Sequence, residues 1–428
     1  MSTPFALNPT GPRLLLVAVL ALLVVTSQPA HAQTESVLYS FCSMPDCSDG
    51  FGPNGNLTLD AQGNVYGATQ YGGADQNGTV FKVTASGAET VLHSFLSGPG
   101  SSPEGSLIWD GKGNLYGTTI GNGYVGLLGQ HFFGAVFELE PHHFKFLYRF
   151  LEKDQQYGAK PTPGLVRDAQ GNLYGTTQYG GANGCATGYG CGTVFKVTPD
   201  KTETVLHSFS GGADGEQPFG GLVVDSERNL YGTTEFGGTG TGCEESSGCG
   251  TVFKVTPSGT ETVLYSFAGG DDGARPIAGL VMDGQGNLYG TTAFGGTGCG
   301  GDSGCGTVFK VTPSGTETVL YNFAGGTDAS GPWSSLVLDG PGNLYGTSYY
   351  GGGSGCTGNA GCGTVFKVTS GGMETVLYRF TGGTDGARPY GGLVLDAQGN
   401  LYGTTYEGGV GECYDGLPGC GVLFKVSP

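Results

Sequence analysis

The sequence predicts an all-β protein, a seven-bladed β-propeller built from four-stranded antiparallel blades. Three observations support this prediction: a motif that recurs seven times at nearly constant spacing, four strand-like segments in each repeat, and an N-terminal segment that supplies a strand missing from the last repeat. A fixed period of this length indicates a repeat architecture. Four antiparallel strands per repeat are typical of propeller blades.

The recurring motif is a tight turn followed by a strand, seen in residues 283–292 as Asp-Gly-Gln-Gly-Asn-Leu-Tyr-Gly-Thr-Thr. The copies start 50 to 58 residues apart, at Asp60, Asp110, Asp168, Asp225, Asp283, Asp339 and Asp396. Asp at the first position and Gly three residues later predict a type I turn followed by a left-handed glycine. We expect the carboxylate to cap the turn. The alternative, a cation ligand, lacks the Asp-x-Asp-x-Asp run of such sites. Arg228 replaces the glycine in one copy, at a cost of about 1 kcal/mol.

The four strand-like segments are clear in the fifth repeat, at residues 278–283, 287–292, 306–312 and 317–323. They are rich in Val, Thr, Tyr and Phe, are bounded by Gly, Pro and Asp, and show no helical periodicity. Lys310 and Glu317 flank the turn between the last two segments, and we expect them to pair across the strands. The same spacing recurs in Lys82/Glu89, Lys196/Glu203, Lys254/Glu261 and Lys367/Glu374.

The two ends of the chain predict that the repeats close into a ring. The last repeat stops at residues 425–428 without its fourth strand, and residues 35–41, Glu-Ser-Val-Leu-Tyr-Ser-Phe, copy that strand. A ring closed by its own N-terminal strand leaves no free sheet edge at the join. The alternative is an open β-solenoid, which would gain nothing from this permutation.

Residues 1–32 have the features of a secretory signal peptide. Arg13 precedes an apolar run over residues 14–25, and an Ala-x-Ala sequence ends at Ala32. The run is short for a transmembrane helix, although an uncleaved N-terminal anchor is the alternative. No other segment is apolar enough to span a membrane. We therefore expect a single propeller domain over residues 33–428, exported to the periplasm, the cell surface or the medium.

The composition limits the partners of the mature chain. It carries 17 basic residues (18 less Arg13) against 36 acidic ones, a net charge of −19. This charge disfavours nucleic acids and anionic membranes. The 87 glycines occupy fixed places in each repeat, between aromatic and β-branched residues, so the chain is not of low complexity. We expect a monomer that binds no nucleic acid.

The twelve cysteines form six local pairs with similar spacing. The pairs are Cys42/Cys47, Cys185/Cys191, Cys243/Cys249, Cys299/Cys305, Cys356/Cys362 and Cys413/Cys420. In an oxidising compartment these pairs are expected to form disulfides, each worth about 2 kcal/mol because the closed loop is short. Zinc is the alternative ligand, but no Cys-x-x-Cys and no nearby histidine supports it.

The strand order places the tight turns on one face of the ring and the long loops on the other. Function on a rigid scaffold is usually found in the longer loops. Candidate ligand-binding residues are an aromatic residue at the start of five long loops and an acidic residue in four connections between repeats. They are Tyr71, Tyr179, Phe236, Phe294, Tyr350, Asp214, Asp272, Asp328 and Asp385.

No catalytic or metal-binding set is found in the sequence. His93 and His207 occupy the place of Tyr265 in another repeat, so we interpret them as strand residues. Trp109 and Trp333 are interpreted as packing residues, although Trp333 follows a proline between repeats and is within reach of the loop face. Nucleophile elbows and phosphate-binding loops are absent. We expect no catalytic residue, no metal and no cofactor.

Three recurring phrases carry a resemblance to a known family: Gly-Asn-Leu-Tyr-Gly-Thr-Thr, Gly-Cys-Gly-Thr-Val-Phe-Lys-Val-Thr and Glu-Thr-Val-Leu-Tyr-Ser-Phe. They resemble the GloVer (Gloeo-Verruco) tandem-repeat proteins of bacteria, which implies an exported protein of unassigned function. The turn motif is also similar to NHL and SMP-30-type propeller blades. The SMP-30-type metal-dependent hydrolases use Glu, Asn and Asp ligands around the channel. We find no matching set here, so no catalytic residue is carried over.

The sequence therefore favours a non-enzymatic exported propeller that binds an unknown glycan or protein on its long-loop face. One alternative is a carbohydrate-active lyase or glycosidase, which needs two suitably spaced carboxylates in the channel. Another is a structural scaffold of the cell envelope.

Overall fold

The computed structural model describes Met1 and residues 34–427, except 99, 122–131, 142, 152–155, 182–184, 186–188, 244–247, 300–303, 357–359, 412 and 414–418. The predicted signal peptide lies almost wholly outside the described residues. Residues 33–428 form one compact unit. Within the described part of the chain, no helix is both long and apolar enough to cross a membrane.

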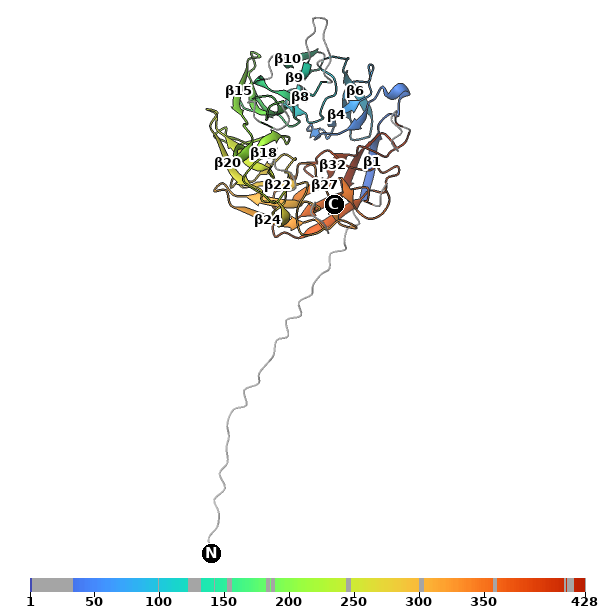
Figure 1. The fold of residues 1–428 in the computed structure, drawn as a ribbon. Coiled ribbons are helices and arrows are strands. Elements are labelled where there is room, and N and C mark those ends of the chain that lie inside the picture. Colours follow the sequence, from blue (N-terminus) through green and yellow to red (C-terminus); the bar gives the residue numbers. More distant parts are fainter. Residues whose placement is uncertain are drawn as a thin grey trace. The chain divides into compact units, whose positions relative to one another are not determined.

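Seven four-stranded antiparallel sheets are arranged in a ring, as the sequence predicts (Figure 1). In the fifth blade the strands run from the channel outwards as β21 (Val281–Met282), β22 (Leu288–Thr292), β23 (Thr307–Val311) and β24 (Glu317–Asn322). The innermost strand is shorter than the predicted segment 278–283. Its first residues contact the preceding blade instead: the Ala278 carbonyl accepts a hydrogen bond from Thr233 Oγ1 at 3.0 Å.

The other blades follow the same order from the channel outwards. Blade one is β3 (Thr58–Leu59), β4 (Val65–Tyr71), β5 (Thr79–Val83) and β6 (Glu89–Ser94); blade two is β7 (Ile108–Trp109), β8 (Leu115–Thr119), β9 (Phe132–Glu140) and β10 (His143–Leu151); blade three is β12 (Val166–Arg167), β13 (Leu173–Tyr179), β14 (Thr193–Val197) and β15 (Glu203–Ser208). Blade four is β17 (Val223–Val224), β18 (Leu230–Phe236), β19 (Thr251–Val255) and β20 (Glu261–Ser266), and blade six is β26 (Val337–Leu338), β27 (Leu344–Ser348), β29 (Thr364–Val368) and β30 (Glu374–Arg379).

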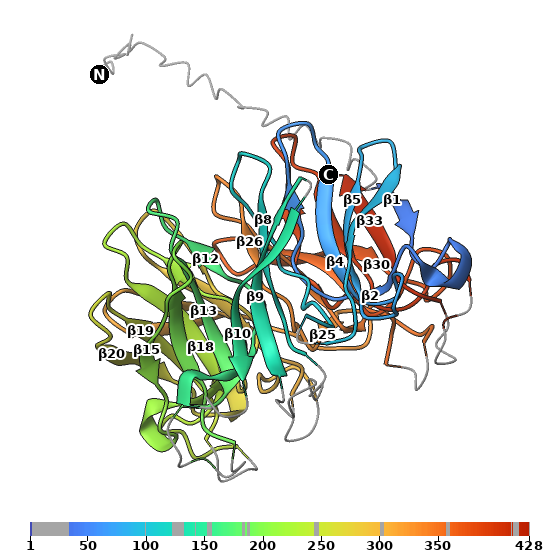
Figure 2. The ribbon, with the colours of Figure 1, turned by 90° about the horizontal axis from the view of Figure 1, so that it is seen from above.

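The seventh blade contains both ends of the folded unit. Its strands are β31 (Val394–Leu395), β32 (Leu401–Thr404), β33 (Val422–Ser427) and, outermost, β1 (Thr34–Ser40). Strand β1 lies beside β33 although the two are at opposite ends of the sequence (Figure 2), with Glu35 opposite Val426. The predicted closure by the N-terminal strand is confirmed.

In several blades a short strand lies at the proline of the connection between blades. It pairs with the end of the second strand that leads into the long loop. These are β2 (Phe51–Pro53), β11 (Ala159–Pro161) and β16 (Glu216–Pro218), while β25 (Ala329–Ser330) pairs with β28 (Tyr350–Gly351). Single 3-10 turns at Pro45–Cys47, Gly212–Asp214 and Gly270–Asp272 lie in connections between blades.

The core is a set of similar packing contacts between neighbouring blades. At each joint a phenylalanine that follows the outermost strand packs at 4.9 to 5.4 Å against a phenylalanine on the third strand of the next blade. The pairs are Phe41–Phe81, Phe95–Phe137, Phe150–Phe195, Phe209–Phe253, Phe267–Phe309, Phe323–Phe366 and Phe380–Phe424. Burial of these rings is a large share of the hydrophobic stabilisation of the ring.

One glycine of the repeated motif is required by this packing. A Cβ atom on Gly290 would lie 2.6 Å from Phe309 Cζ and 2.9 Å from Leu280 Cδ2. Both distances are shorter than van der Waals contact, so the phenylalanine ring occupies the space that a larger residue would fill.

The turn aspartates cap their turns as predicted. Asp283 Oδ1 accepts hydrogen bonds from the backbone N–H groups of Gln285 and Asn287, and Oδ2 accepts from Asn287 Nδ2 and Tyr289 OH at 2.7 to 3.0 Å. Burial acts to raise the pKa of Asp283, but these hydrogen bonds outweigh it and lower the pKa below its usual value. Arg228, which replaces the turn glycine, takes the expected left-handed conformation with φ of 66°.

The predicted Lys/Glu pairs across the outer turn are wrong. Glu317 lies opposite Val311, and Lys310 lies opposite Thr318. Neighbouring residues on a strand point to opposite faces of the sheet, so the two charges face away from each other. Lys310 Nζ instead lies 5.7 Å from the ring centre of Tyr289.

All six predicted disulfides are present. Five lie in the long loop between the second and third strands of blades three to seven, and each joins the middle of the loop to its end. The sixth, Cys42–Cys47, follows the closing strand β1. None of the described cysteines is free.

Candidate functional site

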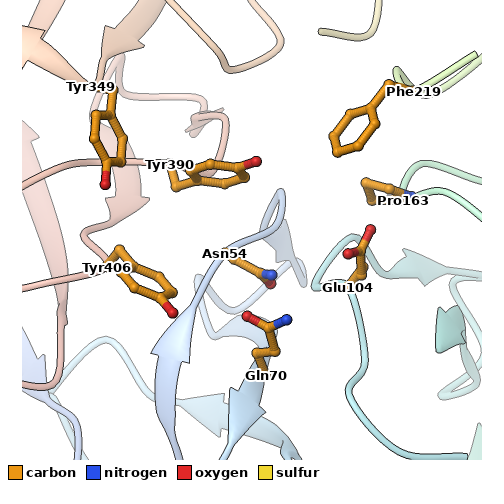
Figure 3. Close-up of a pocket in the computed structure, with 8 residues that line it drawn as sticks. All are labelled: Asn54, Gln70, Glu104, Pro163, Phe219, Tyr349, Tyr390 and Tyr406. Atoms are coloured by element: carbon orange, nitrogen blue, oxygen red, sulfur yellow. The ribbon is translucent and has the colours of Figure 1, made fainter. Parts of the chain in front are cut away.

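A cup on the long-loop face of the ring is the candidate ligand-binding cavity. It encloses about 280 Å³ and is lined by residues from six blades (Figure 3). The lining residues are Asn54, Gln70, Glu104, Pro163, Phe219, Tyr349, Tyr390 and Tyr406. Because Gln70, Tyr349 and Tyr406 stand where second strands lead into long loops, the cup opens on the loop face.

Four of the eight residues that line the cup occupy one position of the repeat, the residue that follows the inter-blade proline. We call this the mouth position, and its occupants are Asn54, Glu104, Thr162, Phe219, Ile277, Trp333 and Tyr390. Six of them line the cup or its floor. In blade three Thr162 is buried, and Pro163 takes its place in the wall.

Below the cup the channel narrows and then widens again. The narrow part encloses about 50 Å³, with Ile277 and Trp333 in its wall beside the glycines and serines of the inner strands. On the far side a second cavity of about 200 Å³ is lined by residues such as Asn56, Ser106 and Ser335. The narrow part therefore forms a floor beneath the cup.

In six blades the backbone just before the mouth residue is hydrogen-bonded to the long loop of the preceding blade. In blade five, the N–H of Arg275, just before the proline, donates to the carbonyl of Cys249 at 2.8 Å. Gln217, Gly331, Arg388 and Gly52 make the equivalent bond to Cys191, Cys305, Cys362 and Cys420. The disulfide at the end of one blade's loop thus positions the mouth residue of the next blade.

The residue before the proline is left-handed in all seven blades. The φ angles lie between 53° and 65° at Gly52, Ser102, Lys160, Gln217, Arg275, Gly331 and Arg388. For an L-residue this conformation costs about 1–2 kcal/mol. Such strain is retained where the surrounding structure fixes the backbone, and it is common near functional sites.

One side of the cup is aromatic. The ring of Trp333 stacks on Tyr349 with 4.4 Å between centroids, and its edge lies 5.9 Å from Tyr390. Arg388 Nη1 is 3.3 Å from the Tyr349 hydroxyl and 3.0 Å from Glu407 Oε1, which fixes that wall. Together with Tyr406 these rings form a rigid apolar surface.

Three polar residues, Asn54, Gln70 and Glu104, also line the cup, and Glu104 lies beside the apolar Pro163 and Phe219 (Figure 3). Within the described residues, Asn54 Oδ1 is buried without a hydrogen-bond partner. Burial raises the pKa of Glu104 to about 7, although the positive charge of Lys160 acts in the other direction. Near neutral pH the carboxyl group of Glu104 therefore exchanges readily between its acid and carboxylate forms. Gln70 adds an amide (Figure 3).

The aromatic residues predicted from the sequence surround the cup rather than line it. Each lies one residue beyond a cup-side position on its strand, so its side chain points to the other face. The Arg275 guanidinium lies 4.9 Å from the ring centre of Phe236 and 5.3 Å from that of Phe294. Tyr71 stacks on Phe51 at 5.3 Å, Lys160 lies 5.1 Å from the ring of Tyr179, and Tyr350 meets the edge of Trp333 at 5.8 Å. These side chains support the rim.

The predicted acidic residues lie in the connections beside the outermost strands and do not join the aromatic residues. Asp272 accepts from Tyr265 OH at 2.7 Å and from the Ala268 N–H. Asp328 and Asp385 make the same pair of bonds with Tyr321 and Ala324 and with Tyr378 and Thr381, and Asp214 lies 3.1 Å from His207 Nε2. None of the four lines the cup.

One group that could hold a metal ion is missed by the sequence analysis. Ligand atoms of His207, Asp214 and Glu261 lie within 4.8 Å of one another. Glu261 belongs to the next blade, so the spacing within one repeat gives no sign of it. The replacement of the usual tyrosine by His207, seven residues before Asp214, is the available signal.

The cup residues form no sequence motif and were not predicted, because their signal is the difference between the repeats. The mouth position holds seven different residue types in seven otherwise similar repeats. A column-by-column comparison of the repeats would have identified it.

Comparisons with known proteins agree with the repeat architecture. The pattern of the Gloeobacter/Verrucomicrobia repeat matches residues 23–243, 123–358 and 243–428. No curated protein matches the sequence. Two solved structures resemble the fold, each 12% identical with a TM-score of 0.41: a protein provisionally named a gluconolactonase, with 93% of both chains covered, and a luciferin-regenerating enzyme, with 92% of this chain and 95% of the other covered. The matched pattern extends over the whole propeller, and the chain belongs to the Gloeobacter/Verrucomicrobia repeat family.

Proposed function

We propose that this protein is an exported, non-enzymatic propeller that binds a glycan or a protein segment in the cup on its long-loop face. The observation that carries the proposal is the variation at the mouth position. The turn and core positions recur from blade to blade, whereas the mouth position holds a different residue type in every blade. Stability alone does not require this variation, but recognition of an asymmetric ligand does.

The physical character of the cup supports ligand binding. Its volume of about 280 Å³ is close to the lower end of small-molecule pockets, about 300–1,000 Å³. Its lining combines rigid aromatic rings with a few polar groups, which is the usual composition of such pockets. Tyrosine and tryptophan also dominate the binding energy of many protein interfaces. Six disulfides fit an oxidising compartment and support the export part of the proposal.

Glycan arrays and pull-downs with the chain 33–428 test the proposal. The double variant Tyr390→Ala/Tyr406→Ala removes two cup walls, and Phe236→Ala/Phe294→Ala removes two rim aromatics as the matched control. We expect the first variant to lose every interaction of the wild type and the second to retain at least part of each. An interaction that survives loss of the cup walls unchanged would contradict the proposal.

A second candidate function, a carbohydrate-active enzyme, is favoured by one observation. Glu104 is a carboxyl group with a pKa raised to about 7, which suits a general acid near neutral pH. Release of reducing ends from a polysaccharide panel, abolished by Glu104→Gln, would support the enzyme. A wild type that binds a polysaccharide without cleaving it would support the binding protein.

A further inference from the structure

Building on the proposed function, we infer that the cup receives the terminal residue of an uncharged glycan, with its ring against the tyrosines and its hydroxyl groups toward Asn54, Gln70 and Glu104. This names the ligand class of the cup and the end of the ligand that enters it.

The separation of the tyrosines from the polar side chains of the cup is the first argument. Tyr349, Tyr390 and Tyr406 lie on one side, Glu104 lies across the cup beside Pro163 and Phe219, and Asn54 and Gln70 lie between them (Figure 3). A sugar ring has a similar division, because its C–H groups form an apolar face while its hydroxyl groups project from the edge. The C–H face can pack on the electron-rich faces of aromatic rings, which bury a large area in a fixed geometry.

An unused hydrogen-bonding group is the second argument. Within the described part of the chain, Asn54 Oδ1 is buried and has no hydrogen-bond partner. An unpaired polar group that is shielded from water costs about 1–3 kcal/mol. A ligand hydroxyl group that donates to Asn54 Oδ1 offsets this cost, and other hydroxyl groups of the same ligand can pair with Gln70 and Glu104.

The charges around the cup argue against a charged ligand. Among the described residues that line the cup there is no lysine or arginine, and the chain has a net charge of −18, so an acidic sugar would be repelled. A cation would meet the two positive side chains at the rim. Arg388 lies 3.3 Å from the Tyr349 hydroxyl, and the positive charge of Lys160 acts on Glu104. An uncharged ligand avoids both penalties.

The floor of the cup argues for a chain end. The space contracts from about 280 Å³ in the cup to about 50 Å³ beneath it. A space of about 50 Å³ is too small to hold a second sugar ring, so we expect the glycan not to continue beneath the cup. The rest of the glycan must therefore leave the cup toward the long loops.

Isothermal titration with the chain 33–428 between pH 5.5 and 8.5 tests the inference. The probes are trisaccharides that end in glucose, galactose, mannose, xylose or N-acetylglucosamine, acidic counterparts that end in glucuronate or sialate, and tetramethylammonium chloride. We expect at least one neutral trisaccharide to bind, and its counterpart with the same residue in an internal position to bind at least tenfold more weakly.

Four variants identify the site and the ligand class. Tyr390→Ala and Tyr406→Ala are each expected to weaken binding of the neutral trisaccharide at least tenfold, while the rim variant Phe294→Ala changes it less than threefold. Glu104→Gln keeps hydrogen-bonding capacity without charge, so binding should stay within about threefold. The pH dependence of binding around pH 7 should disappear in this variant.

The possible outcomes separate this inference from the proposed function. Preferential binding of tetramethylammonium, strengthened above pH 7 and lost in Glu104→Gln, would overturn the neutral class but keep the cup as the site. A preference for acidic or internal sugars would do the same. The class is also overturned if no sugar binds at millimolar concentration while a protein partner depends on Tyr390 and Tyr406. Sugar binding that none of the cup variants weakens would overturn both this inference and the proposed function.

Discussion

The two faces of this ring differ in how strictly the repeats agree. On the turn face, every blade uses an aspartate, and the Asp283 carboxylate shows the pattern by accepting four hydrogen bonds within its own turn. At the cup on the loop face, seven blades present seven different residue types at one backbone position. The comparison teaches that the repeated positions report what the fold requires. The positions that vary on the same scaffold are where we propose that recognition takes place.

The largest difference in stability between the two kinds of position is expected when a repeated core residue is removed. Phe309→Ala removes one ring of a joint whose phenylalanines are both fully buried, and we expect a loss of about 3–5 kcal/mol in unfolding free energy. Phe219→Ala in the cup should cost much less, because Phe219 is only partly buried and faces the cavity. Urea denaturation of both variants measures the difference. Equal losses would mean that the cup is as much a part of the core as the joints are.

A second experiment tests whether a repeated glycine is required for packing or merely recurs in every repeat. Gly290→Ala places a methyl group 2.6 Å from Phe309 Cζ, and overpacking of this kind costs about 1–3 kcal/mol. Gly284 is the control in the same blade, because no atom lies within 4 Å of its Cβ position. Gly284→Ala should change stability by less than about 0.5 kcal/mol. Similar effects at both sites would refute the packing argument.

Much of the fold could be predicted from the sequence because it depends on local and repeated signals. The turn aspartates, the alternation of strands, the cysteine spacing and the strand copied at residues 35–41 are all visible without coordinates. The Lys310/Glu317 pair was wrong because flanking a turn does not fix which face of the strand a residue occupies, and the observed register sets these two on opposite faces.

The site was harder to predict, because it is assembled from positions about one repeat apart. Phe236 and Phe294 were expected to contact ligand, yet they hold Arg275 at the rim. Glu104 and Tyr390 come from blades two and seven, and only closure of the ring brings them into one cavity. Their individual contexts contain no motif, so the signal was the difference between the repeats.

The disulfides link the scaffold to the cup, because the loops that they close hold the mouth residues, and they allow a third test. Cys185→Ala/Cys191→Ala should lower the unfolding free energy by about 2 kcal/mol at most and leave the far-ultraviolet circular dichroism unchanged. Because the Cys191 carbonyl holds Gln217, two residues before Phe219, ligand affinity should also fall several-fold. The variant Cys42→Ala/Cys47→Ala should mainly lower stability, since this pair follows the closing strand. Mass mapping of the non-reduced protein that found bridges between blades would contradict the local pairing.

The smallest effect of a single residue on stability is expected for the first glutamate of the outermost strands. Burial raises the pKa to about 7 at Glu35, Glu89, Glu203, Glu261, Glu317 and Glu374. A raised folded-state pKa contributes stability that is complete below the unfolded value near 4.5 and is lost as the pH rises through 7. The turn aspartates, with lowered pKa values, act oppositely at low pH.

We therefore expect the melting temperature to be highest in mildly acidic solution and to fall by several degrees between pH 5 and pH 8. Glu317→Gln should leave it unchanged at pH 5 and raise it slightly at pH 8, because an unpaired buried charge is removed. Thermal melts at the two pH values measure this effect. A wild-type melting temperature that rises toward pH 8 would contradict the assignment.

The separation of scaffold from recognition is tested most directly by one paired measurement on three proteins. The wild type, the turn variant Asp283→Asn and the cup variant Tyr390→Ala/Tyr406→Ala are each melted and then applied to the same glycan array. We predict that Asp283→Asn lowers the melting temperature and keeps the wild-type binding profile, while the cup variant keeps the melting temperature within a few degrees and loses the profile. A cup variant that still binds the same glycans, or a turn variant that changes which glycans are bound, would contradict the account.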